Sequence, residues 1–400
     1  MCISLCEYAQ PMKLNLVAPE ISCEISYAIR KEIMMPDLKI TTKQAIMLVV
    51  TVIVSHTIVT LPTTLLKETK SATILNLIYV SILALILVYL IYQLFKKFQG
   101  QDIIDVSEYL GGPFLKNIIG IIFIVYFLSS SGILLRNFSE GLKVIYFPNT
   151  NIAFIILAFI VALCYTNTLH FSSNVKAVSI ILPTVIISII FLFIGNIQNF
   201  SFQRALPILG DGIYNTFVTG LGNIVAFGGI SCLYFIPPLL KEPEKMKKIA
   251  ISSILICAFY LLLCTSTILF MFSFFDTIDE ILPLYTAVSY IEFGTFFQRL
   301  DAIFLLIWVL EICCYLSIAC QFSMFIFKKI SKINYLKPLA FVFPLFIFGI
   351  SLLPKTTADS RFIGDTVYKY IILAVVFLLG FIILISANIK KKKVGVENKE

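Results

Sequence analysis

Two ionisable side chains interrupt apolar stretches of this chain and are the first candidates for chemistry. His56 lies within 54-VSHTIVTLPTTLL-66, and Glu311 breaks the otherwise uncharged run 302–327. A carboxylate near the centre of a membrane span costs about 2.5–3.5 kcal/mol, so ionisable groups at this depth usually face the interior and serve a function. We expect Glu311 to be paired with His56, Tyr315 or a bound cation, unless it is neutral or purely structural. His56 is either a ligand-site residue or a core histidine with satisfied hydrogen bonds.

Signatures of catalysis and of metal binding are scarce. The chain has 2 histidines and no HExxH, GxSxG or P-loop pattern. The GLG at 220–222 is a partial dinucleotide loop, but it lacks the preceding strand and βαβ context that such a loop needs. Of the 10 cysteines most fall in apolar runs, and none forms a CxxC pair. We therefore expect no enzyme, no metal site and no cofactor.

Poor helix formers are concentrated in the apolar segment 220-GLGNIVAFGGISCLYFIPPLL-240. In a helix interior, glycine costs about 1 kcal/mol and proline about 3 relative to alanine. Unwound backbone is tolerated at membrane depth only where protein or a polar cavity satisfies it. We expect a break at Gly228–Gly229 whose freed backbone groups hold a small ligand, with half-helix N-termini favouring a carboxylate. Gly220 and Gly222 indicate close helix packing instead.

The elements that must position these residues are membrane helices. The chain is 59% hydrophobic and 14% charged, with a mean hydropathy of +0.96, whereas a soluble domain is about 45–50% apolar and about 25% charged. A spanning helix needs roughly 20 mostly apolar residues. Ten such runs predict an all-α integral membrane protein with ten transmembrane helices: 44–66, 71–95, 117–135, 144–175, 177–203, 212–240, 249–275, 302–327, 338–354 and 370–389.

The ten runs divide into two fives, and the first run of each half is the disturbed one. Interrupted helices at corresponding places in two inverted halves point to the binding site of a secondary transporter. An odd number of spans in each half forces the inversion. The sequence thus predicts a five-plus-five inverted-repeat (LeuT-like) transporter fold with discontinuous helices 1 and 6.

The predicted ligand site draws on both disturbed spans and on the two spans with polar residues at matching depth. It comprises Ser55, His56, Thr57, Thr60, Tyr126, Ser130, Ala226, Gly228, Gly229, Ser231, Glu311 and Tyr315. The hydroxyls of the third span either line the cavity or bond to their own helix carbonyls.

Glu311 has a specific predicted role. A zwitterionic amino acid in a dry pocket needs a partner for each charge. Freed amides can hold the carboxylate, and Glu311 is the single carboxylate within the ten runs. We expect it to bind the ammonium group, directly or through Tyr315, with His56 tuning its charge.

Lys and Arg residues set the expected orientation. With ten spans the termini share a side, and 22 Lys/Arg fall on that side against nine on the other; cytoplasmic loops are enriched in these residues. The net charge of +8 is therefore topological and indicates no nucleic-acid partner. Residues 1–38 form a polar extension, with Met34 and Met35 as alternative starts, 39–390 the membrane domain and 391–400 a basic cytoplasmic tail.

Four short segments suggest a family. The segments 60-TLPTTLLKETK-70, 107-SEYLGG-112, 235-FIPPLLKEPEKMKK-248 and 298-QRLDAIFLLIWVL-310 resemble the B subunit of spore germinant receptors, within the amino acid–polyamine–cation transporter superfamily. The resemblance implies a multi-pass protein of the spore inner membrane. It also implies assembly with a membrane-bound A subunit and a lipoprotein C subunit, and a role as sensor of germinants, often amino acids.

Two positions depart from the family pattern. Ser55, His56 and Thr57 stand where small residues are expected, and Ser231 stands where an acidic residue is expected, while Glu311 lies on another span. A pocket acid has thus moved between helices. The predicted function is a germinant-sensing receptor subunit; the alternative is an ion-coupled symporter of amino acids or organic cations. A pure scaffold fits less well, because it would not need disturbed spans.

Overall fold

The chain is helical throughout the residues that the structure describes. The computed structural model describes residues 39–58, 61–273, 282–291, 300–331, 333 and 338–397, and the elements below belong to one compact unit, Ile40–Glu400. The polar extension 1–38 and the site position Thr60 lie outside the described residues, as does the side chain of Thr57. An isolated β-bridge joins Ile40 to Leu240.

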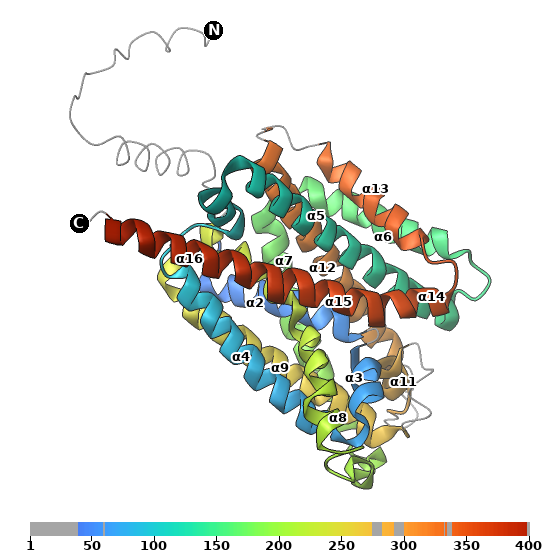
Figure 1. The fold of residues 1–400 in the computed structure, drawn as a ribbon. Helices are drawn as coiled ribbons and strands as arrows, with labels where there is room; N and C mark the ends of the chain where they lie inside the picture. Colours follow the sequence, from blue (N-terminus) through green and yellow to red (C-terminus); the bar gives the residue numbers. More distant parts are fainter. Residues whose placement is uncertain are drawn as a thin grey trace. The chain divides into compact units, whose positions relative to one another are not determined.

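The elements follow the order of the predicted spans (Figure 1). The α-helices before the C-terminal one are α2 (Thr42–Val54), α3 (Leu61–Thr69), α4 (Thr73–Phe95), α5 (Ile103–Tyr146), α6 (Ile152–Thr168), α7 (Phe171–Gly195), α8 (Ile213–Phe217), α9 (Met246–Met271), α11 (Pro283–Ser289), α12 (Leu300–Ser331) and α13 (Leu339–Leu352). The 3-10 helices are η2 (Ser55–Ile58), η3 (Lys70–Ala72), η4 (Ile197–Asn199), η5 (Phe202–Ala205), η6 (Thr219–Tyr234), η7 (Pro237–Leu239) and η8 (Pro243–Lys245).

A single long element, here called the C-terminal helix, ends the unit. It consists of α14 (Thr357–Phe362), α15 (Tyr368–Ile372) and α16 (Gly380–Glu397), joined by the π-helical segments η9 (Ile363–Val367) and η10 (Leu373–Leu379). It is longer than the predicted run 370–389, because helix continues through the charged residues on either side.

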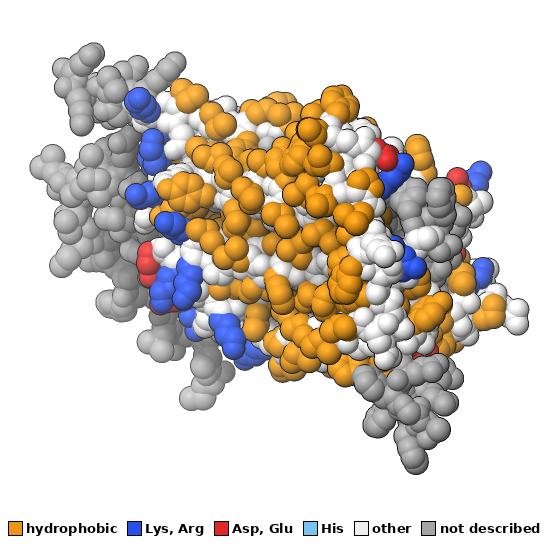
Figure 2. Space-filling view, turned by 90° about the horizontal axis from the view of Figure 1, so that it is seen from below, with side chains coloured by type: hydrophobic (Ala, Val, Ile, Leu, Met, Phe, Trp, Pro, Cys, Tyr) orange, Lys and Arg blue, Asp and Glu red, His pale blue; other side chains and the backbone are white. Residues whose placement is uncertain are grey.

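The apolar surface fits a membrane protein. Seven helices in the described part of the chain are long and apolar enough to cross a membrane, and three shorter apolar helices (α2, α6 and α13) occupy the remaining predicted runs. In the space-filling view, hydrophobic side chains cover a broad middle band while Lys and Arg gather at one end (Figure 2). The ten runs therefore all contain helix, seven of them in helices of full spanning length.

Two ends of the bundle can be distinguished by their contacts. The terminal end carries Ile40, Leu240, Asp102 and Lys329, and also Lys390, which binds backbone carbonyls near the start of α5. The distal end carries the ion pair between Lys70 and Asp211. In Figure 1 the C-terminal helix (red) runs alongside α5 (teal) from α14 to α16 and so connects the two ends.

Helix α2 lies at the centre of the bundle. Every residue from Leu48 to Val54 is buried, and α2 packs against α7, α9, α12 and η6. A helix that is apolar all round belongs in a core. It starts at a capping box, in which Thr41 and Gln44 satisfy each other's backbone N–H groups. It ends at Val54, where the α-helix gives way to the 3-10 segment η2, and the next described helix begins at Leu61.

The sixth run is interrupted differently from the prediction. Thr219–Tyr234 is wound as a 3-10 helix, and the non-helical residue is Phe227 (φ −97°, ψ 20°), one position before the predicted break at Gly228–Gly229. A 3-10 helix rises about 2.0 Å per residue, against 1.5 Å for an α-helix. Sixteen residues in this form therefore cover about 32 Å, close to the thickness of a hydrocarbon core.

An ion cluster ties the start of α5 to the last turn of α12. The Nζ of Lys329 donates to Oδ2 of Asp102 (2.5 Å) and to Oδ2 of Asp105 (2.7 Å), while Oδ1 of Asp102 caps α5 by accepting from Ile104 N and Asp105 N. Burial raises the pKa of the Asp102 carboxyl to about 6, with the Lys329 ammonium opposing that shift and Asp105 adding to it. Asp102 is fully buried, so its charge depends on this lysine.

Removing that lysine gives a pH-dependent loss of stability. A carboxyl whose pKa is raised in the folded state stabilises the fold while protonated, and this contribution disappears as pH rises through about 6. Without the lysine, the pKa of Asp102 rises further, and ionising this carboxyl costs more. The melting temperature of Lys329→Met should therefore fall further below that of the wild type at pH 8 than at pH 5. We expect about 3 kcal/mol at pH 8, the lower end for a broken buried pair, because Lys329 is 20% exposed.

The measurement is thermal unfolding of the purified protein in detergent at both pH values. Lys328→Met, next to it on α12, is the matched control. A deficit that is equal at pH 5 and pH 8 would contradict the assignment of the effect to Asp102.

Candidate functional site

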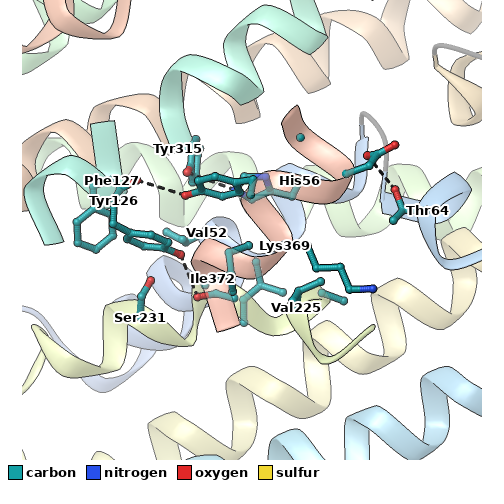
Figure 3. Close-up of a pocket in the computed structure, with 17 residues that line it drawn as sticks. Val52, His56, Thr64, Tyr126, Phe127, Val225, Ser231, Tyr315, Lys369 and Ile372 are labelled. Carbon is teal, nitrogen blue, oxygen red and sulfur yellow. Dashed lines mark hydrogen bonds between the residues drawn. The ribbon is translucent and has the colours of Figure 1, made fainter. Parts of the chain in front are cut away.

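A cavity lies where the two interrupted elements meet. Its volume, counted as space for the centres of water molecules, is about 70 Å³, which corresponds to roughly five water-sized groups. Residues of α2 and η2, of η6, of α5 and α12, and of the C-terminal helix line it (Figure 3). The cavity therefore has room for a small solute.

Three predicted residues form a hydrogen-bonded group beside the cavity; His56 and Tyr315 belong to the cavity wall, and Ser130 contacts both. The hydroxyl of Tyr315 lies 2.6 Å from Oγ of Ser130 and 3.3 Å from Nε2 of His56, and Ser130 lies 3.4 Å from the same nitrogen. The rings of His56 and Tyr315 meet edge to face with centroids 5.1 Å apart. Helices α2/η2, α5 and α12 are thus joined by polar contacts at one point, and Ser130 faces this group rather than a carbonyl of its own helix.

Tyr126 links α5 to η6 and to the C-terminal helix. Its hydroxyl donates to the carbonyl oxygen of Gly228 at 3.4 Å, and its ring stacks on Tyr368, whose hydroxyl donates to the Tyr126 carbonyl at 3.2 Å. Ser231 also lines the cavity, and its buried Oγ makes no hydrogen bond within 3.5 Å. These groups contribute aromatic rings and hydroxyls to the cavity wall.

Gly229 is where η6 touches α2. A Cβ built there would lie 2.8 Å from Ile53 N and 2.9 Å from the carbonyl carbon of Val52. Both are backbone atoms, so a side chain could be admitted only by moving a helix. At Gly228 the nearest atoms belong to the side chain of Ile372. Gly229 therefore sets the distance between the two interrupted elements, and both glycines line the cavity together with Ala226.

Glu311 is buried behind the cavity wall rather than in it. Oγ of Ser55 donates to its Oε1 at 3.3 Å, and Oε2 makes no hydrogen bond within 3.5 Å. The expected partners His56 and Tyr315 contact each other instead. Thr51, one helical turn before Ser55, also has a buried hydroxyl without a hydrogen bond of this length. Burial is complete at Glu311, and it is not among the residues that line the cavity.

Four polar cavity residues were not predicted from the sequence. Thr64 lies on α3, and Asp365, Tyr368 and Lys369 lie on the C-terminal helix. With Ile372, the last three follow the spacing i, i+3, i+4 and i+7 of one helical face. This spacing is visible in the sequence and could have indicated one helix face. The two residues were not considered because, as charged residues, they lie outside the uncharged run 370–389.

Comparison with known proteins identifies the family. The model of the family described as spore germination protein matches residues 39–360. The chain belongs to the spore germination protein family. Spore germination protein YndE of Bacillus subtilis (strain 168) is 23% identical over 368 residues, covering 89% of this chain and 98% of that protein. Spore germination proteins A2 and B2 of the same organism are 23% and 19% identical, each covering 89% of this chain and 97% of their own length.

A solved structure extends the comparison to the fold. The chain resembles a Na⁺-coupled sialic acid symporter, solved in a substrate-bound outward-open state, with a TM-score of 0.61 over 88% of this chain and 83% of that one. The sequences are 11% identical, so the likeness concerns the fold. This member of the spore germination family therefore has a helical fold like that of a transporter.

The two cavity glycines provide a matched pair of variants. Gly229→Ala forces α2 and η6 apart and should destabilise the protein by about 1–3 kcal/mol, as overpacking does. Gly228→Ala presses only on the side chain of Ile372, which can move, and should cost less. The melting temperatures of the purified variants in detergent test this order. Equal losses would show that the contact of Gly229 with α2 does not limit the packing.

Proposed function

We propose that this protein is the germinant-sensing subunit of a spore germinant receptor and that it binds a small molecule, an amino acid, in the cavity. The observation that carries the proposal is the position of the cavity. It is lined by both interrupted elements, where helix ends and glycine-rich backbone meet a chain of hydroxyls. Membership of the spore germination protein family supports the same role, and no catalytic role is proposed.

The proposed architecture is the ten-span, five-plus-five inverted repeat. It is supported by the helix found in each of ten runs, by the interruptions in the first and sixth, and by the likeness to a symporter. The terminal end then faces the cytoplasm, on the spore-core side of the inner membrane, with both termini there. The excess of Lys and Arg on the side of the termini supports this orientation.

The ligand contacts follow from the lining of the cavity. His56, Tyr126, Ser231 and Tyr315 offer hydroxyl and ring groups, and backbone is approachable at Ala226, Gly228 and Gly229. Ser130 supports this wall through its hydrogen bond with Tyr315. The sequence also places Thr57 and Thr60 in this site. The A and C subunits of the receptor, together with membrane lipid, are the proposed partners.

Tyr315 gives the test of the cavity as a germinant site. Tyr315→Phe removes the hydroxyl that joins Ser130 and His56. A neutral hydrogen bond contributes about 0.5–1.5 kcal/mol, so spores carrying the variant should need roughly 2- to 10-fold more germinant at normal subunit levels. The matched control is Tyr146→Phe, at the distal end of α5, where the hydroxyl contacts Tyr285. An unchanged dose response in Tyr315→Phe would remove this group from the germinant site.

The second candidate function is ion-coupled symport, and Glu311 favours it. A buried carboxylate with one unbonded oxygen, beside the hydroxyls of Ser55 and Thr51, offers oxygen ligands to a proton or a small cation next to the cavity. Glu311→Gln keeps the shape and removes the charge.

Uptake of labelled amino acid into vesicles containing the protein distinguishes the two functions. A symporter should accumulate it under an imposed H⁺ or Na⁺ gradient, and Glu311→Gln should abolish the dependence on that gradient. A sensor should show binding without accumulation. Accumulation that is equal in wild type and Glu311→Gln would exclude Glu311 as the coupling site.

A further inference from the structure

The distal end of the cavity is bounded by two ion pairs between α3 and the C-terminal helix. Nζ of Lys67 lies 3.8 Å from Oδ2 of Asp365, and Lys369 is paired with Glu68. Thr64 on α3 donates to Oδ1 of Asp365 at 3.0 Å. The order of charges is opposite on the two helices, cation before anion on α3 and anion before cation on the other. Two neighbouring residues of α3 are thus held by two residues one turn apart.

Each pair has one member in the cavity wall and one behind it. Asp365 and Lys369 line the cavity, whereas Lys67 and Glu68 do not. In the described residues, the cavity wall therefore presents one anion and one cation, and these are its charged residues. Side chains four apart on a helix have Cβ atoms about 5–6 Å apart. Both ends of a zwitterion can reach the two groups at once.

The two pairs differ in geometry. The Lys67–Asp365 distance exceeds hydrogen-bond length, and Oε2 of Glu68 is buried without a hydrogen bond within 3.5 Å. Gly222 of η6 leaves room for the lysine, because a Cβ there would lie 2.7 Å from Nζ of Lys369. The ammonium group of Lys369 is thus seated between α3 and η6.

The opposite part of the cavity is aromatic. Figure 3 shows Tyr126, Phe127 and Tyr315 grouped away from Thr64 and Lys369. A small amino acid fits this division, with its two charges toward the C-terminal helix and its side chain against the rings. The other orientation would bury both charges against aromatic groups at a high desolvation cost.

We propose that the ligand enters by exchanging ion pairs: its ammonium group takes Asp365 from Lys67, and its carboxylate takes Lys369 from Glu68. Asp365 and Lys369 then determine specificity for zwitterions, and α3 is released from the C-terminal helix in the same step. This rests on the proposed function of the cavity as the germinant site. It assigns the ligand's charges to residues other than Glu311.

Charge reversal separates recognition from structure. Lys369→Glu alone breaks the pair with Glu68, whereas Lys369→Glu combined with Glu68→Lys restores a pair between the helices but leaves two anions facing the cavity. The receptor is tested in spores with its partner subunits present. The probes are glycine, alanine, serine and valine, each with its primary amide, which keeps the ammonium group and lacks the carboxylate.

The double variant should accumulate at the wild-type level in spore membranes. It should nevertheless need about 10- to 150-fold more amino acid for the same germination response, the value of a lost hydrogen bond between charged groups. The increase in the required concentration should be smaller for the amides, which lack the carboxylate. Reversal of the exposed pair Lys70–Asp211, with side chains 44% and 47% exposed, is the control and should change neither. A double variant with the wild-type dose response would reduce the pair to a structural contact and overturn the proposal.

The wild type distinguishes this inference from the function on which it rests. A wild-type receptor that responds only to uncharged germinants overturns the ion-pair exchange and leaves the sensing role intact. If deletion of the chain removes no germinant response at all, the proposed function itself fails.

Discussion

The backbone of η6 lies against the backbone of α2 at Gly229, and the position of every group around the cavity depends on that distance. Two membrane segments without side chains between them can approach closely, and close approach brings polar backbone into contact where lipid cannot reach it. The contact leaves a space of the size of a small solute beside it rather than a filled core. It also fixes His56 opposite Tyr315, since η2 follows directly from α2.

Charge is handled differently at three depths of the bundle. At the terminal end the ammonium group of Lys329 forms ion pairs with both Asp102 and Asp105 and so joins α12 to the start of α5. At the distal end Asp365 is paired with Lys67 and Lys369 with Glu68, across two helices. In between, Glu311 has one hydroxyl partner and an unbonded oxygen. Burying an ionised group without compensation is expensive, so ionisation costs more at Glu311 than at the two paired carboxylates of the terminal end.

Much of this arrangement could be read from the sequence, because the signals were local. Uncharged runs located the helices, and the glycines and prolines located the sixth interruption to within one residue. His56 was proposed for the site as an ionisable group within a span, Tyr315 as a candidate partner of Glu311, and Tyr126 and Ser130 as polar groups of the third span. The partner of Glu311 was not predictable, because Ser55 and His56 are adjacent in sequence and the direction of each depends on the winding of η2.

The charged wall of the cavity was missed for a related reason. The predicted span was taken to begin after the nearest charged residue, so Asp365 and Lys369 were placed outside it. In the structure the helix that carries them begins earlier, at Thr357. Charges at the end of a span are ordinarily solvated. These two are held by α3, so their burial is a tertiary effect that no single stretch of sequence reports.

The C-terminal helix connects the cavity directly to the terminal end of the bundle. It carries Asp365 and Lys369 at one end, and at the other Lys390 donates to the carbonyls of Tyr109 and Leu110, immediately before the kink of α5 at Gly111–Gly112. One π-helical segment, η9, contains Asp365, and the other, η10, lies between Lys369 and Lys390; each is a local surplus of backbone in an element that is otherwise α-helical. A surplus residue can migrate along a helix by passing hydrogen bonds from one carbonyl to the next. Such a migration would rotate the residues that it passes about the helix axis, so the two π-helical segments are where a change at Asp365 and Lys369 would be converted into rotation.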